Sequence, residues 1–115
     1  MAILWAIVLT VPSPRQDARA DSFYSIGQTA RLRGFPGVRL RIPLDRDTVE
    51  DLYRALWDDN KLAYDEVISR PGWIQAFDGQ AVRIIDVYKA VFQVELMDGP
   101  NAGVQAWVML HQLRP

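Results

Sequence analysis

The chain contains 115 residues, of which half are hydrophobic and 23% are charged, a balance typical of a globular protein rather than a disordered one. Its 13 Lys and Arg residues against 14 Asp and Glu give a net charge of −1, which lacks the positive excess expected of a nucleic-acid-binding protein. The absence of cysteine excludes disulfides, a thiol nucleophile and thiolate metal sites. This length allows one domain and argues against two.

The N-terminal segment Ala2–Val11 is apolar and carries no charge. It is about half as long as a membrane-spanning helix but matches the hydrophobic segment of a secretory signal. The small-x-small sequence at Ala18 to Ala20 predicts cleavage before Asp21. We therefore expect residues 1–20 to be a signal peptide and the protein to be exported, periplasmic or secreted, with no membrane span in the mature form.

One feature of this segment favours a different interpretation. No Lys or Arg precedes the apolar residues, although a signal peptide normally begins with a positive region. The alternative is that Ala2–Val11, which is rich in Ile, Val, Leu and Trp, forms a buried edge strand of a cytoplasmic protein.

The next predicted elements are two strands. Gln28–Arg33 and Val38–Ile42 alternate between apolar and polar residues, and they flank the turn-forming residues 34–37. If the two strands pair antiparallel as a hairpin, one face is apolar and the other carries four arginines. The apolar face holds Ala30, Leu32, Val38 and Leu40, and the basic face holds Arg31, Arg33, Arg39 and Arg41.

A helical insertion is predicted at about residues 47–69. Asp47 and Glu50 form a D-x-x-E start, in which Asp47 can accept hydrogen bonds from the first-turn amides. A weaker second turn follows around Tyr64 and ends before Arg70–Gly72. One continuous apolar stripe, which must bury against the sheet or a partner, is formed by Val49, Leu52, Tyr53, Leu56 and Trp57.

The last third of the chain predicts several short strands with turns between them. Such spacing favours a small β-barrel. The predicted strands are Trp73–Phe77, Ala81–Tyr88, Val91–Met97 and Val104–Met109.

This C-terminal part resembles a bacterial SH3-like (SH3b-type) domain. The resemblance rests on the motifs DGQAVRIID at 78–86, FQVEL at 92–96, DGPNAG at 98–103 and AWV at 106–108. It implies a mainly β fold, a small SH3-like barrel spanning 21–115 with an inserted amphipathic helix and Gln28–Leu32 as its first strand. It also implies binding of a protein or cell-wall ligand outside the cytoplasmic membrane, without catalysis.

The barrel prediction has a consequence for Trp107. If Phe92, Val94 and Leu96 line the interior and Val108 lies opposite Val94, then Trp107 points outward, near Glu95. An outward tryptophan is either covered by the helix or exposed as a ligand platform. We expect the helix to cover it, because the apolar stripe needs a partner and isolated exposed tryptophans are uncommon.

Residues with catalytic chemistry are few. His111 is the only histidine, and the serines have no nucleophile motif around them. We expect no catalytic residue, no metal and no cofactor. A small hydrolase is the alternative, and it requires His111 beside a carboxylate in a cleft.

The expected function is a non-catalytic binding or accessory module of the bacterial cell envelope. Its partner is a protein or a cell-wall polymer, and a cytoplasmic protein-interaction domain is the alternative. The arginine face could bind carboxylates or phosphates of such a partner; otherwise these arginines are solvated or pair with the acidic side of the helix. The candidate binding residues are Arg31, Arg33, Arg39, Arg41 and Trp107.

Overall fold

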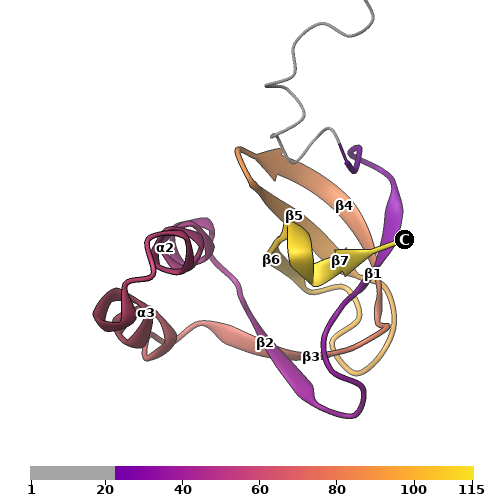
Figure 1. Ribbon diagram of the computed structural model, residues 1–115. Coiled ribbons are helices and arrows are strands. Elements are labelled where there is room, and N and C mark those ends of the chain that lie inside the picture. The colour runs from indigo at the N-terminus through magenta and orange to yellow at the C-terminus, as the bar shows by residue number, and fades with distance from the viewer. Residues whose placement is uncertain (1–22) are drawn as a thin grey trace, which may run out of the picture.

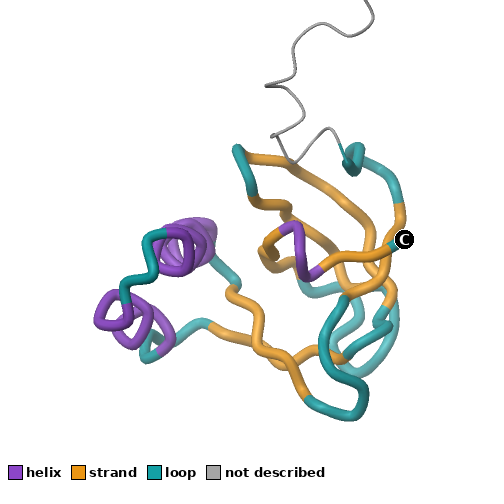
Figure 2. The backbone as a smooth tube through the Cα atoms, viewed as in Figure 1, coloured by secondary structure: helices purple, strands orange, loops and turns teal. Residues whose placement is uncertain are grey.

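The computed structural model describes residues 23–115, so the predicted signal peptide at 1–20, its cleavage before Asp21 and the alternative strand at Ala2–Val11 lie outside the described residues. Two β-sheets lie beside a pair of helices (Figure 1), and the rest of the described chain forms a short 3-10 helix, turns and loops (Figure 2). The elements in chain order are β1 (Thr29–Leu32), β2 (Arg39–Pro43), α2 (Arg46–Trp57), α3 (Lys61–Ile68), β3 (Trp73–Phe77), β4 (Ala81–Tyr88), β5 (Val91–Leu96), β6 (Gln105–Met109), the 3-10 helix η3 (Leu110–Gln112) and β7 (Leu113–Arg114).

Five of the strands form one antiparallel sheet in the order β6-β5-β4-β1-β7. The four strands predicted in the last third of the chain are confirmed, with bounds within one residue of those observed. Gly79 has a φ of 85° in the turn before β4, a conformation that glycine adopts without steric cost. The alternating pattern and the turn residues of this region therefore suffice to place its strands.

The predicted hairpin between Gln28–Arg33 and Val38–Ile42 is wrong. Strand β1 pairs with β4 and β7, whereas β2 pairs with β3 in a separate two-stranded sheet. The chain does turn at residues 34–37, but it leaves the first sheet there. A Cβ on Gly34 would overlap the side chain of Leu40, so glycine permits the close passage of the two segments.

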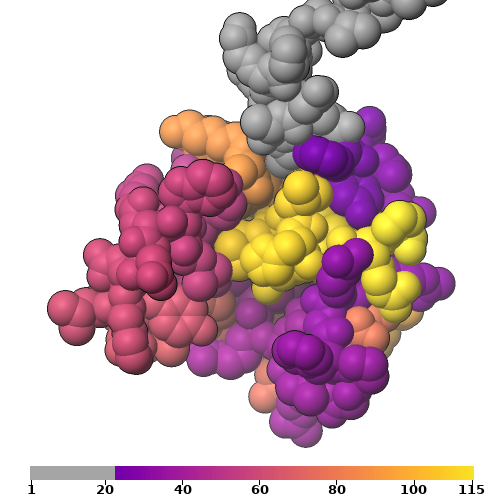
Figure 3. All heavy atoms as spheres, in the orientation of Figure 1, coloured from indigo at the N-terminus to yellow at the C-terminus, as the bar shows by residue number. Residues whose placement is uncertain are grey.

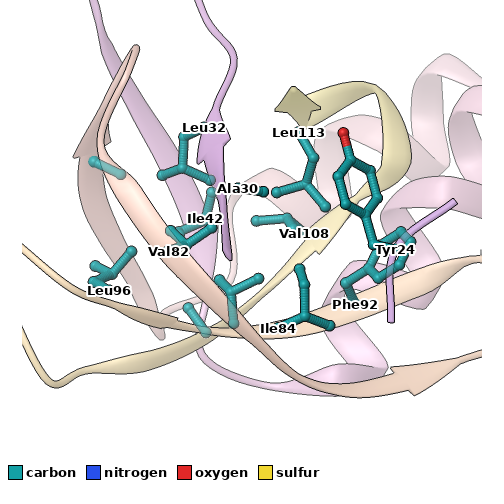
Figure 4. Close-up of a cluster of buried hydrophobic side chains, with 13 residues drawn as sticks. Tyr24, Ala30, Leu32, Ile42, Val82, Ile84, Phe92, Leu96, Val108 and Leu113 are labelled. Carbon is teal, nitrogen blue, oxygen red and sulfur yellow. The ribbon is translucent and has the colours of Figure 1, made fainter. Parts of the chain in front are cut away.

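One core lies between the two sheets, and side chains from both sheets meet in it (Figure 4). Phe92 and Leu32 of the large sheet and Ile42 of the small sheet are each fully buried. Within the described residues, β2 and β3 pair only with each other, so the two sheets enclose the core without joining into a closed barrel. The mainly β prediction with inserted helices is confirmed, and the inward direction of Phe92, Val94, Leu96 and Val108 is confirmed too.

The pairing of β5 with β6 differs from the predicted register by two residues. Val108 lies opposite Phe92, and Val94 lies opposite Ala106. Trp107 accordingly lies opposite Gln93 rather than near Glu95. A shift of two keeps every side chain on its predicted face, because side chains alternate with a period of two along a strand.

The insertion predicted at about residues 47–69, a helix followed by a weaker second turn, consists of the two helices α2 and α3. Asp59 has a φ of 52° between them, a left-handed conformation that aspartate tolerates better than most residues. The side chain of Asn60 then caps α3 by accepting a hydrogen bond from the Ala63 amide at 3.1 Å. Arg70 joins the two helices, with Nη1 2.9 Å from Asp51 Oδ2 and Nη2 2.6 Å from Glu66 Oε1.

The N-terminal cap of α2 is Asp45 and not the predicted Asp47, which lies in the first turn. Asp45 accepts hydrogen bonds from the amide and the hydroxyl of Thr48. The hydroxyl bond is the main reason why the pKa of Asp45 is lowered from its ordinary value of 3.8. A carboxyl with a lowered folded-state pKa stabilises the fold above that ordinary value and loses its contribution as the pH falls through the folded-state pKa.

We therefore expect Asp45→Ala to lower the free energy of unfolding by about 1 kcal/mol at neutral pH. The difference from the unsubstituted protein should shrink when urea unfolding is measured well below pH 3.8, where the carboxyl becomes protonated. Asp45→Asn is the matched control, because asparagine caps helices as well as aspartate but does not titrate. An equal loss for Asp45→Ala at both pH values would contradict this role.

Candidate functional site

The structure separates the four arginines of the predicted basic face. Arg31 and Arg33 belong to β1 and its end, and Arg39 and Arg41 belong to β2 in the other sheet. All four are exposed. None of the ion pairs found among residues 23–115 includes any of them, so the alternative in which they pair with the acidic side of the helix is not seen there.

Two of these arginines have specific neighbours. Arg31 Nη1 donates a hydrogen bond to the Gly79 carbonyl at 2.9 Å. The guanidinium of Arg41 lies 4.9 Å from the ring centroid of Trp73, a cation–π contact across the β2–β3 pair.

The expectation that the helix covers Trp107 is confirmed. Its side chain is 6% exposed and packs on the face of the sheet opposite to the main core, in a second cluster with Val49, Leu52 and Val67 of the helices. Trp107 therefore supports the attachment of α2 and is not a ligand platform in this structure.

The helix stripe is only half covered, and this reveals a site that the sequence prediction missed. Val49 and Leu52 are buried, but Leu56 is 47% and Trp57 is 77% exposed. Helix α2 buries the face that carries Thr48, Val49, Leu52 and Ala55, so Leu56 and Trp57 of the stripe remain exposed to solvent. The spacing of the apolar residues predicted the stripe correctly. Which of these residues are buried depends on how α2 packs against the sheet and α3.

A groove of about 220 Å³ lies between this exposed half of α2 and the turn that joins β4 to β5. Helix α2 and this turn lie next to each other on the surface shown in Figure 3. We call this site the aromatic groove. Its lining residues are Glu50, Tyr53, Arg54, Trp57, Tyr88, Lys89, Ala90 and Val91.

Aromatic rings form the walls of the aromatic groove. The rings of Tyr53 and Trp57, one helical turn apart, stack with centroids 6.1 Å apart and planes inclined by 21°. Tyr88 faces them from the end of β4. Aromatic side chains offer a large apolar surface at a low cost in conformational entropy, which makes them frequent anchors for ligands.

Cations surround Tyr88 on the other side of the aromatic groove. The guanidinium of Arg46 lies 4.0 Å from its ring centroid, and the Lys89 ammonium lies 5.3 Å from it. Arg46 also contacts Glu50 at 3.7 Å, whereas no ion pair among residues 23–115 includes Lys89. The groove thus combines apolar faces with charged side chains of both signs, namely Glu50, Arg54 and Lys89.

The surroundings of His111 differ from those that the hydrolase alternative requires. His111 lies on η3, is exposed, and borders a pocket with Tyr24, Gln28 and Arg33. No Asp or Glu side chain of the described residues lines this pocket.

Residues 23–115 also contain no group of three or more His, Cys, Asp or Glu residues arranged to hold a metal ion. None of the helices in this part of the chain has the length and apolar content that crossing a bilayer requires.

Comparison with known proteins gives no relative: no protein-family model, curated protein or solved structure matches this chain.

Proposed function

We propose that this chain is a non-catalytic SH3-like binding module of the bacterial cell envelope, which holds a protein or cell-wall ligand in the aromatic groove. The SH3-like assignment is supported by the order of elements. Strand β1 precedes a long insertion with the helices, β4 to β6 follow with the motifs that carry the resemblance, and the single helical turn η3 leads into the last strand.

The exposure of Trp57 is the observation that carries the binding proposal. A tryptophan that is 77% exposed leaves a large apolar surface in water, which is unfavourable for the free protein. Its stacking on Tyr53 holds the ring in one orientation beside the groove. Binding a ligand there would remove this surface from water at little further cost in side-chain entropy.

The binding proposal is tested with Trp57→Ala and, as the matched control, Phe35→Ala. Phe35 is 78% exposed and does not line the groove. We expect Trp57→Ala to weaken retention on purified peptidoglycan sacculi or on immobilised envelope proteins by roughly 30-fold, the size of a binding hot spot. Both variants should unfold within about 0.5 kcal/mol of the unsubstituted protein, because both side chains are exposed.

Two results would contradict the proposed site. One is equal retention of the two variants on the material that retains the unsubstituted protein. The other is the absence of retention of the unsubstituted protein on both materials. Retention on sacculi or on envelope proteins identifies which of the two ligand classes is bound.

The export prediction is tested separately by mass spectrometry of the protein isolated from its native cell. We expect a mature chain that begins at Asp21, because the small-x-small sequence at Ala18 to Ala20 would direct cleavage there. A chain that retains Ala2–Val11 would contradict export and would favour the cytoplasmic interaction domain.

A further inference from the structure

Two arginines face each other at the edge of the five-stranded sheet. Arg31 of β1 lies directly opposite Arg114 of β7 in the antiparallel register, and β7 is the outermost strand (Figure 1). Residues directly opposite in such a pair project from the same face of the sheet. Like charges in this position destabilise a sheet, so the pair is unfavourable for the isolated fold.

Both side chains reach the same turn. Arg31 Nη1 donates to the Gly79 carbonyl at 2.9 Å, and Arg114 Nη2 lies 3.4 Å from the position that a Cβ on Gly79 would occupy. Two guanidinium groups from different strands thus converge on Gly79. The hydrogen bond to the carbonyl leaves most of the donors of Arg31 unused, since a guanidinium has five.

Two acidic residues close to the turn at Gly79 accept hydrogen bonds from backbone amides instead of pairing with these guanidiniums. Asp78, which precedes Gly79, accepts from the Gly34 amide at 3.0 Å. Asp98 accepts from the Ala81 amide at 3.2 Å. None of the ion pairs in the described part of the chain includes Arg31 or Arg114. The charge of the pair is therefore not neutralised by an ion pair within residues 23–115.

We propose that Arg31 and Arg114 together bind a phosphate group. A carboxylate carries one negative charge and is satisfied by one guanidinium, whereas a phosphate monoester or inorganic phosphate carries nearly two charges and three acceptor oxygens. Two converging guanidiniums therefore match a phosphate, in its charge and in its number of acceptor oxygens, better than they match a carboxylate. The phosphate site lies on β1 and β7, away from the helices and the aromatic groove, and does not depend on the ligand proposed for that groove (Figure 1).

The test is a titration of the protein with inorganic phosphate, followed by NMR of the backbone amides and arginine side chains at constant pH and ionic strength. We expect saturable shifts at Gly79 and at the Nε signals of both arginines. The double variant Arg31→Gln with Arg114→Gln should bind about tenfold more weakly or worse, because charge-assisted hydrogen bonds are lost. Acetate should bind more weakly than phosphate, and dimethyl phosphate should show whether a phosphodiester is also accepted.

The matched control is Arg39→Gln, which removes an exposed arginine from the other sheet and should leave phosphate binding unchanged. In low salt, the double variant should melt close to the unsubstituted protein, because removal of the repulsion between the pair offsets the lost hydrogen bond from Arg31 to the Gly79 carbonyl. Phosphate should raise the melting temperature of the unsubstituted protein but not of the double variant. Shifts that do not saturate, or equal weakening by Arg39→Gln and by the double variant, would overturn the proposal and leave only a general response to ions.

Discussion

Replacing Phe92 with alanine should lower the free energy of unfolding by about 3–5 kcal/mol, the usual cost of removing a large aromatic side chain from a core. Phe92 lies on β5, is fully buried, and meets the ring of Tyr24 edge-on with centroids 5.6 Å apart (Figure 4). The cavity would open in the core that the two sheets share, so both sheets would lose contacts. A loss of this size is a large part of the free energy of unfolding expected for a domain formed by residues 23–115.

Urea unfolding followed by circular dichroism measures this loss. Phe35→Ala is the matched control, because it removes the same side chain from a turn where it is 78% exposed, and it should cost less than about 0.5 kcal/mol. Similar stability of the two variants would show that Phe92 does not lie in the common core.

The second large effect is expected for Trp107→Ala, at about 3–5 kcal/mol. Trp107 packs between the sheet and the helices, in the cluster that includes Val49, Leu52 and Met109. This cluster is distinct from the core around Phe92, so the substitution should loosen the helices from the sheet before it disturbs the strands. Trp57→Ala is the matched control, since Trp57 is 77% exposed and its removal should leave stability nearly unchanged.

Acrylamide quenching tests the seating of the helices by a measurement that does not involve unfolding the protein. The chain contains four tryptophans, so variants that retain only Trp107 or only Trp57 are compared, with the others replaced by phenylalanine. Fluorescence of Trp107 should be quenched several-fold less than that of Trp57, because the helices shield it from solvent. Equal quenching would mean that the helices do not cover this face of the sheet in solution.

The C-terminal strands could be predicted because the signals that mark them, alternating side chains and turn residues, lie within each short segment. Most strand residues within 73–109 alternate between apolar and polar side chains. Asp and Gly residues mark the turns at 78–79 and 98–103, whereas Lys89 and Ala90 join β4 to β5. The same alternation predicted that Phe92 and Val108 point inward and Trp107 outward, and this remained correct although the register differs by two residues.

Strand pairing could not be predicted in the same way. The segments on both sides of residues 34–37 have the pattern of a hairpin, but β1 obtains its partners from β4 and β7, which lie about 50 and 80 residues further along the chain. Alternation shows which face of a strand is apolar and does not show which other strand completes its hydrogen bonds. The cap of α2 is a smaller and local error, because Asp45 and Asp47 are both suitable residues and the extended backbone of Asp45 makes it the cap.

The candidate site also combines features that the sequence predicts with features that it does not. The spacing of Tyr53 and Trp57 on one helix face could be read directly, and so could the arginines at alternate positions of the strands. Neither the aromatic groove nor the convergence of Arg31 and Arg114 could be derived, because each joins residues from distant segments.

The sequence alone therefore determined a mainly β chain, most of its strands, the position of its helices and the direction in which most core side chains point. These properties depend on neighbours a few residues away, through backbone geometry and the period of each element. Tertiary structure decided the pairing of the strands, the two separate sheets, the extent to which α2 is covered and the two surface sites. These properties depend on contacts between distant segments, whose free energies are settled only when the whole core packs.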